Sequence, residues 1–196
     1  MRGIRDVSKS LVLLCSPREN GTTDELALYF IEGYKRESAS IDVAALRDHD
    51  IRTCVNCGYC SSHPLKCVFD IDDATTLLER FLAARLVVFA SPVYFYGPPA
   101  TLKALIDRGQ KYWTGFREEL SSGHVIELLA AGRVAGERVF EGTKLILNCF
   151  SRVMNKNKPR AFSYRGLENP GDISRKIISE LRSLGASVAR AVRDEQ

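Results

Sequence analysis

The sequence lacks the features that mark membrane proteins and nucleic-acid-binding proteins. No apolar stretch approaches the roughly 20 residues that cross a bilayer. The apolar run at residues 11–14 is too short for a signal peptide, and no small-residue cleavage site follows it. The net charge is only +4, and no basic run is interleaved with aromatic residues. We therefore expect a cytoplasmic protein that binds neither membrane nor nucleic acid.

Two common nucleotide-binding signatures are also missing. The chain has no Gly-Lys-Ser/Thr loop, which counts against ATP, and no Gly-x-Gly-x-x-Gly motif, which counts against a Rossmann nicotinamide site. No nucleophile–base pair is readable, so we do not expect hydrolysis and predict no catalytic side chain. Repeats and linkers are absent as well, and residues 1–196 suit one domain.

Cysteine, by contrast, is concentrated in one place. Four of the six cysteines fall within residues 54–67, and the first three are separated by two residues each. Such gaps let thiolates converge on one centre, and Gly58 and Pro64 favour the tight turns required. In a reducing compartment such a set indicates an iron–sulfur cluster or tetrahedral zinc rather than disulfides. The predicted metal ligands in the loop at 53–68 are Cys54, Cys57, Cys60 and Cys67.

The other reactive side chains have simpler interpretations. We expect His63 to be exposed rather than a metal ligand, because it lies beside a proline in a loop. Cys15 and Cys149 are expected to be buried apolar residues. Asp107 and Arg108 stand at a predicted helix end and suggest a structural pair or a subunit contact.

Short apolar runs alternate with amphipathic segments along the whole chain. A helix is expected after the first strand, with Thr22 or Thr23 as its N-cap. Another is expected after the cysteine loop, with Asp72 or Asp73 as its N-cap. The alternation predicts an α/β fold with a doubly wound parallel sheet between two helical layers and a ligand site at the carboxyl ends of the strands. The strands are expected at residues 11–15, 41–46, 86–90, 124–131 and 160–164.

Two loops at this edge have the chemistry of a binding site. Residues 16–23 offer hydroxyls, an amide and a guanidinium at a helix N-terminus, which suits a phosphate, although an ordinary capped turn is the alternative. Residues 92–97 display three consecutive aromatics, which suit a planar ring system, a core cluster or a subunit contact. The candidate cofactor-binding residues are Ser16, Arg18, Asn20, Gly21, Thr22, Thr23, Pro92, Val93, Tyr94, Phe95, Tyr96 and Gly97.

These loops, the cysteine motif, Asp72-Asp73, Leu102-Lys103 and Asp107-Arg108 together give a resemblance to a known family. Over roughly its first 110 residues the chain resembles the flavodoxin-like NADPH-dependent FMN reductase superfamily, most closely its iron–sulfur flavoprotein branch. The resemblance implies five parallel strands in the order 2-1-3-4-5. It also implies FMN held with its phosphate on the first loop, its isoalloxazine along the second, and a weaker third contact at residues 132–136.

The same resemblance implies a [4Fe–4S] cluster on the four loop cysteines. The function expected is an FMN-dependent oxidoreductase that passes electrons between this cluster, FMN and a ferredoxin-like carrier or small-molecule acceptor, because the cofactor supplies the electron chemistry. It also implies a homodimer or homotetramer. Two alternatives stay open: an NAD(P)H-dependent FMN or quinone reductase without a working cluster, and a zinc-stabilised binding module without redox activity.

Overall fold

A computed structural model describes residues 10–37, 39–113, 123–136 and 138–194. Its centre is a five-stranded parallel sheet in the order β2-β1-β3-β4-β5. This confirms the predicted doubly wound, flavodoxin-like topology. The strands are β1 (Ser10–Leu14), β2 (Asp42–Ala45), β3 (Leu86–Pro92), β4 (His124–Ala131) and β5 (Arg160–Arg165).

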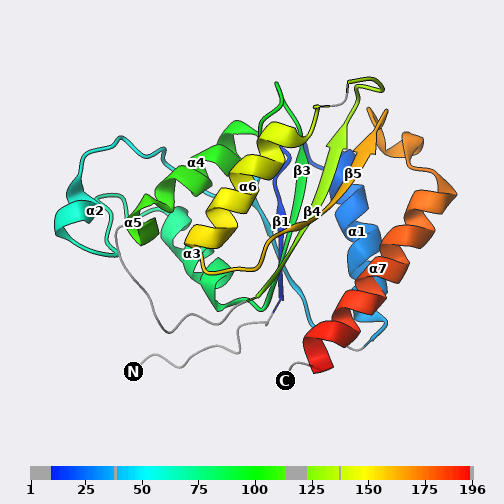
Figure 1. Cartoon of the computed structure of the whole chain (residues 1–196), viewed down its shortest axis with the longest axis horizontal. Coiled ribbons are helices and arrows are strands. Elements are labelled where there is room, and N and C mark those ends of the chain that lie inside the picture. The colour runs from blue at the N-terminus through cyan, green and yellow to red at the C-terminus, as the bar shows by residue number, and fades with distance from the viewer. Residues whose placement is uncertain (1–9, 38, 114–122, 137, 195–196) are drawn as a thin grey trace.

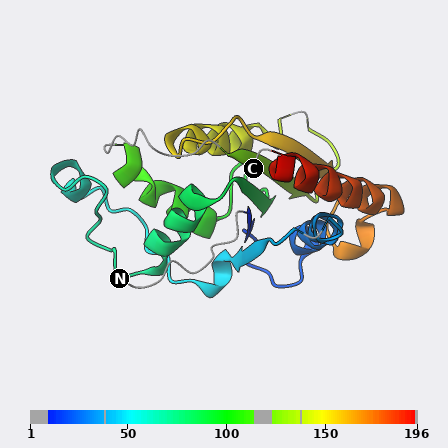
Figure 2. The same cartoon turned by 90° about the horizontal axis from the view of Figure 1, so that it is seen from below.

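The sheet lies between two layers of helices, with α1 and α7 on one face and α3, α4 and α6 on the other (Figures 1 and 2). The inner strands β1, β3 and β4 are apolar along nearly their whole length because both of their faces are covered. The helical segments are α1 (Thr22–Lys35), η1 (Leu46–Asp48), α2 (Tyr59–Ser62), α3 (Asp73–Ala83), α4 (Ala100–Arg108), α5 (Gln110–Trp113), α6 (Glu141–Val153), η2 (Pro170–Asp172) and α7 (Arg175–Asp194).

The two helices of the first layer, α1 and α7, touch at their backbones. A Cβ atom added to Gly33 of α1 would lie 1.9 Å from the carbonyl oxygen of Arg182. One added to Gly185 of α7 would lie 2.1 Å from the carbonyl oxygen of Phe30. Glycine at both positions therefore sets how closely the helices approach. The Arg182 guanidinium adds an ion pair to Glu32 at 2.7 Å.

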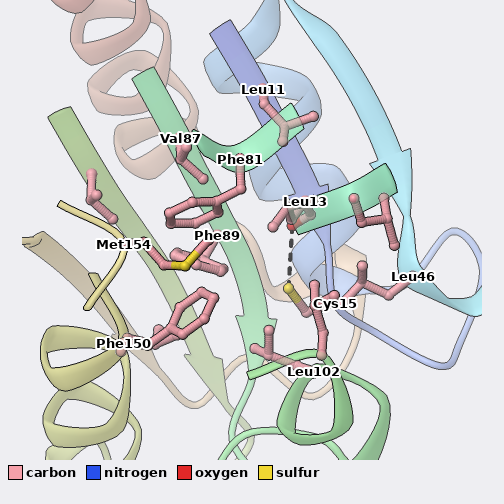
Figure 3. Close-up of a cluster of buried hydrophobic side chains, with 14 of the residues drawn as sticks. Leu11, Leu13, Cys15, Leu46, Phe81, Val87, Phe89, Leu102, Phe150 and Met154 are labelled. Atoms are coloured by element: carbon pink, nitrogen blue, oxygen red, sulfur yellow. Dashed lines mark hydrogen bonds between the residues drawn. The ribbon is translucent and has the colours of Figure 1, made fainter. Parts of the chain in front are cut away.

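The opposite face holds an aromatic core between the sheet and α3, α4 and α6. Phe81, Phe89 and Phe150 pack around the sheet centre (Figure 3). Cys15 is buried there, as predicted, and its Sγ donates to the carbonyl oxygen of Leu13 at 3.3 Å. Burial raises the pKa of the Cys15 thiol, with Asp24 adding to the effect, so this cysteine is inert at neutral pH.

Two local predictions about side chains are wrong. Cys149 is exposed because α6 buries Leu147 and Phe150, and position 149 faces the opposite side of the helix from Leu147. The N-cap of α1 is Gly21 rather than a threonine, and no side chain caps this helix. The other cap prediction is confirmed, because Asp72 accepts the Ala74 N–H at 3.1 Å.

Among the described residues, none of the helices is long and apolar enough to cross a membrane.

Candidate functional site

The loops that follow β1, β3, β4 and β5 meet at the carboxyl edge of the sheet, at the top of Figure 1. The Arg18 guanidinium in the first loop donates to the carbonyl oxygen of Glu168 beyond β5, at 3.1 Å. Arg133, beyond β4, donates to the Tyr96 hydroxyl beyond β3, also at 3.1 Å. The two candidate binding loops thus lie at the sheet edge where this architecture places its ligands.

The first loop, residues 16–23, is held in shape by its own side chains. The Ser16 hydroxyl accepts the Arg18 N–H and donates to the Arg18 carbonyl, both at 3.0 Å. Asn20 has a left-handed backbone (φ 53°), and its N–H donates to the Asp24 carboxylate at 3.0 Å. One predicted phosphate donor, the Ser16 hydroxyl, is therefore already used within the loop, and so is the backbone N–H of Asn20.

Other groups in this loop suit an anion. Thr22 is 5% exposed, and its hydroxyl makes no hydrogen bond within the described structure. It begins α1, where backbone N–H groups also lack helical acceptors. Thr23 is buried beside it, and the Arg18 side chain folds over Gly21, where an added Cβ would lie 3.2 Å from its Nε. The residues present fit a phosphate group.

One carboxylate opposes an anion at this position. Asp24 lies in the first turn of α1 and pairs with Arg47 at 3.1 Å. Burial raises the pKa of Asp24, while the Arg47 guanidinium and the Asn20 N–H counteract that effect. Arg47 compensates the Asp24 charge, which leaves Arg18 as the cation of the loop and the exposed Glu19 as its remaining carboxylate.

The aromatic loop is a two-residue hairpin with an unusual backbone. Tyr94 and Gly97 exchange both backbone hydrogen bonds at 2.9 Å. Phe95 and Tyr96 between them have φ of 50° and 66°, which is the pattern of a type I′ turn. Aromatic residues at both left-handed positions are rare, and such strain concentrates at functional sites. The turn leaves the Phe95 side chain fully exposed and about half of Tyr94 and Tyr96 exposed.

The start of α6 supports this hairpin from below. A Cβ added to Gly142 would lie 2.4 Å from the Tyr96 carbonyl oxygen, and Thr143 donates its hydroxyl to the same oxygen at 3.5 Å. Arg133 of the loop at 132–136 bonds the Tyr96 hydroxyl, so this third loop lies next to the hairpin. Its contact with a cofactor stays a prediction.

The cysteine loop projects from the side of the domain beside α5 (Figures 1 and 2). It curls around a cavity of ≈ 70 Å³ that is lined by all four predicted ligands and by Arg108 and Lys111. Gly58 makes the predicted left-handed turn at φ 73°, but the second turn is at Leu65 (φ 65°) rather than at Pro64. Across residues 10–37, 39–113, 123–136 and 138–194, the side chains of His, Cys, Asp and Glu nowhere gather into a metal-binding group of three. The loop therefore brings the cysteines around one cavity without closing their sulfurs into a coordination sphere.

A buried ion pair joins this loop to the core. Arg108 is 2% exposed, and its Nη1 donates to the Asp72 carboxylate, whose side chain is 1% exposed. Burial alone would lower the pKa of Arg108, but Asp72 and, more weakly, Cys67 raise it. Asp107 instead pairs with Lys103 at 2.7 Å, so these two neighbours bind different partners. Sequence adjacency had pointed to a structural role for Arg108 but not to this partner.

Lys111 is a second buried cation in the cavity wall, and it was not among the predicted site residues. Its Nζ donates to Asp70 at 2.8 Å and to the Thr75 hydroxyl at 2.9 Å. Burial raises the pKa of Asp70, but the bonds from Lys111, Thr75 and the Cys67 N–H outweigh it and lower the pKa overall. Arg108 ends α4 and Lys111 lies in the short α5, so no helical periodicity in the sequence pointed to this pair. His63 is exposed, as predicted, and stacks on Tyr59.

Comparison with known proteins decides the family. The family model described as NADPH-dependent FMN reductase matches residues 8–162. The chain belongs to this family. It is 29% identical over 184 residues to an iron-sulfur flavoprotein of Methanocaldococcus jannaschii, which covers 91% of this chain and 94% of the relative. An iron-sulfur flavoprotein of Archaeoglobus fulgidus is 24% identical over 188 residues, 93% of this chain and 80% of the relative. These similarities support its place in the iron–sulfur flavoprotein branch.

Solved structures agree with this fold. An FMN-dependent NADH-azoreductase of Bacillus anthracis, solved in complex with FMN, aligns with a TM-score of 0.68 at 14% identity, over 92% of this chain and 98% of that one. An NAD(P)H:quinone oxidoreductase of Methanothermobacter marburgensis aligns with a TM-score of 0.65 at 20% identity, over 91% and 94%. The chain is an FMN-binding oxidoreductase by family, which confirms the predicted FMN-dependent oxidoreductase, while the part of the cluster stays a prediction.

Proposed function

We propose that this flavoprotein passes electrons between FMN at the carboxyl edge of the sheet and a [4Fe–4S] cluster held by Cys54, Cys57, Cys60 and Cys67. The observation that carries the proposal is that all four cysteines line one small cavity whose wall also contains two buried cations. When bound, FMN exchanges one or two electrons and the cluster exchanges one. A zinc-stabilised module without redox activity does not agree with the family, which is one of oxidoreductases.

The chain's own residues would hold the flavin as follows. The Thr22 hydroxyl, the N–H groups at the start of α1 and the Arg18 guanidinium bind the phosphate, while Ser16 keeps the loop in shape. The hairpin at 94–97, with Pro92 and Val93 leading into it, would hold the isoalloxazine, and its exposed aromatic side chains would shield the ring from water. Holding the flavin in this way requires no protein side chain to donate or accept a proton.

The exposed hairpin also bears on assembly. Phe95 is fully exposed between the half-exposed Tyr94 and Tyr96, and an exposed apolar patch of this kind marks an interaction site. We propose a homodimer or homotetramer in which a neighbouring copy covers this side chain and completes the flavin site. Light scattering of the FMN-loaded protein tests this, and a monomer with full FMN affinity would contradict it.

Metal and sulfide analysis tests the cluster. The protein is produced and purified without oxygen, and its iron, acid-labile sulfide, zinc and FMN contents are measured together with its absorption spectrum. We expect about four iron and four sulfide per chain and one FMN. Cys57→Ser should lose the cluster and keep FMN, while Cys149→Ser, at an exposed cysteine outside the loop, should keep both. Loss of both cofactors in Cys57→Ser would assign the cysteines a folding role instead.

A second candidate function is an NAD(P)H-dependent FMN or quinone reductase in which the cysteines take no part. The absence of an assembled three-ligand metal group among the described residues favours it. So does a 28% identity over 100 residues to a protein of Bacillus subtilis named as a putative NAD(P)H-dependent FMN-containing oxidoreductase. Quinone reduction by NAD(P)H at equal rates in wild type and Cys57→Ser, with no iron in either, would establish this function in place of the first.

A further inference from the structure

The cysteine loop enters and leaves the domain through a narrow neck. Arg52 precedes its first cysteine and Phe69 follows its last, and the Arg52 guanidinium lies over the Phe69 ring at 5.7 Å. The Arg52 N–H donates to the Asp72 carboxylate at 3.1 Å. The two ends of the loop are therefore adjacent, and both are tied to the start of α3.

One guanidinium spans this neck. Arg108 donates from Nη1 to the Arg52 carbonyl at 3.2 Å and from Nη2 to the Phe69 carbonyl at 2.9 Å. Nη1 is also bound to the Asp72 carboxylate, which in turn accepts the Arg52 N–H. A planar guanidinium holds three acceptors in fixed directions from two separate nitrogens, whereas an ammonium carries three rotatable donors on a single nitrogen.

The remaining nitrogen of this side chain is not used. Arg108 Nε is buried and has no hydrogen-bond partner within the described structure. Arg108 and Cys67 line the same cavity, and the Cys67 thiol lies close enough to act on the guanidinium electrostatically. A buried N–H donor without an acceptor is costly, and a thiolate or sulfide sulfur in the cavity would accept it.

We propose that Arg108 is the positioning residue of the cysteine site: its two Nη groups close the neck of the loop at 53–68, and its Nε–H is the donor kept for a sulfur of the bound cluster beside Cys67. The inference rests on the proposed function for the cluster, but the closing of the neck does not. Hydrogen bonds to cluster sulfur raise the reduction potential, so Arg108 also acts on the electron affinity of the site.

The test replaces Arg108 by a residue that still neutralises the buried Asp72 carboxylate. Arg108→Leu would leave that buried charge unpaired and risks misfolding. Arg108→Lys keeps the charge but gives up the Nε donor and the fork that joins the two carbonyls. Arg80→Lys is the matched control, because Arg80 pairs with Asp42 at 2.6 Å far from the loop. FMN content and thermal unfolding of each variant show whether the fold is intact.

Two sets of measurements test separately whether Arg108 closes the neck and whether it donates to the cluster. Trypsin cuts at Lys66, which is exposed inside the loop. In cluster-free protein we expect Arg108→Lys to be cut about fivefold faster than wild type or Arg80→Lys, as the loss of about one net hydrogen bond implies. In cluster-loaded protein we expect iron release to a chelator to accelerate similarly and the cluster midpoint potential to fall.

Equal rates of tryptic cleavage in wild type, Arg108→Lys and Arg80→Lys would overturn the claim that Arg108 closes the neck. An unchanged midpoint potential and an unchanged rate of iron release in Arg108→Lys would overturn the claim that its Nε–H donates to the cluster. A wild type without iron and sulfide would end the proposed function for the cluster. In that case the tryptic comparison still decides whether Arg108 closes the loop.

Discussion

Glu127 makes the stability of this protein depend on pH in a way that can be calculated. It lies in the middle of β4, between Phe89 of β3 and Ala161 of β5, and is 1% exposed. Neither carboxylate oxygen has a hydrogen-bond partner among the described residues. Burial raises the pKa of Glu127 from 4.5 to about 7, although Lys144 opposes the rise. The native state therefore holds a proton that the unfolded chain releases near pH 4.5.

The sign and size of the effect follow from this difference. Between pH 4.5 and 7 the unfolded state binds fewer protons than the native state at this position, so stability falls as pH rises. A pKa difference of about 2.5 units lowers the free energy of unfolding by about 3 kcal/mol, and the full decrease is reached above pH 7. Glu127→Gln keeps the shape without the charge. We expect it to match the wild type near pH 4 and to be about 3 kcal/mol more stable at pH 8.

Denaturant unfolding of the FMN-loaded proteins at fixed FMN concentration, from pH 4 to 8, measures this difference. Glu79→Gln, at an exposed glutamate of α3, is the control and should follow the wild type at every pH. If the difference between Glu127→Gln and wild type is the same at pH 4 and pH 8, the buried carboxylate is not the cause and the argument fails.

Four further substitutions test other parts of the structure. Gly142→Ala should weaken FMN binding about tenfold in a fluorescence titration, because its Cβ would push the Tyr96 carbonyl and the hairpin away; unchanged affinity would remove the hairpin from the site. Gly185→Ala should cost about 2 kcal/mol of unfolding free energy by forcing α1 from α7, while Gly171→Ala, where a Cβ meets nothing, should cost little. Lys156→Met should lower the free energy of unfolding by about 2 kcal/mol, because Lys156 Nζ donates to the Leu82 and Ala84 carbonyls at 2.9 and 2.6 Å. Lys158→Met, at an exposed lysine, is the control and should leave the free energy of unfolding unchanged. Arg18→Ala should raise the FMN dissociation constant about tenfold, and full flavin retention would contradict the phosphate assignment.

The order of the strands was predictable because local and long-range preferences agree along this chain. The apolar runs of β1, β3 and β4 are too short for buried helices, and their alternation with amphipathic segments permits few topologies. The bounds of β4 match the prediction to the residue. The position of the two loops at the carboxyl edge then follows from the parallel direction of the strands.

Features that depend on contacts distant in sequence could not be predicted in the same way. Arg108 meets a carboxylate and two carbonyls that lie 36 to 56 residues earlier, and no periodicity reports such contacts. The left-handed turn at Phe95 and Tyr96 contradicts the preferences of both residues, so sequence rules would not place it there. The prediction that Cys149 is buried was wrong because it rested on the apolar character of the side chain and not on its position on α6.

Because one guanidinium holds both ends of the cysteine loop, the two exits of the loop stay in place whatever lies between them. We expect changes of length or composition within residues 53–68 to leave the pairing of β1 with β2 and the start of α3 intact, provided that the contact of Leu65 with the hydrophobic core is kept. The cysteines could then be lost, or replaced by a set with other spacing, on an unchanged flavin-binding domain. Such a chain would have to keep Asp72, Arg108 and the two backbone carbonyls that Arg108 holds.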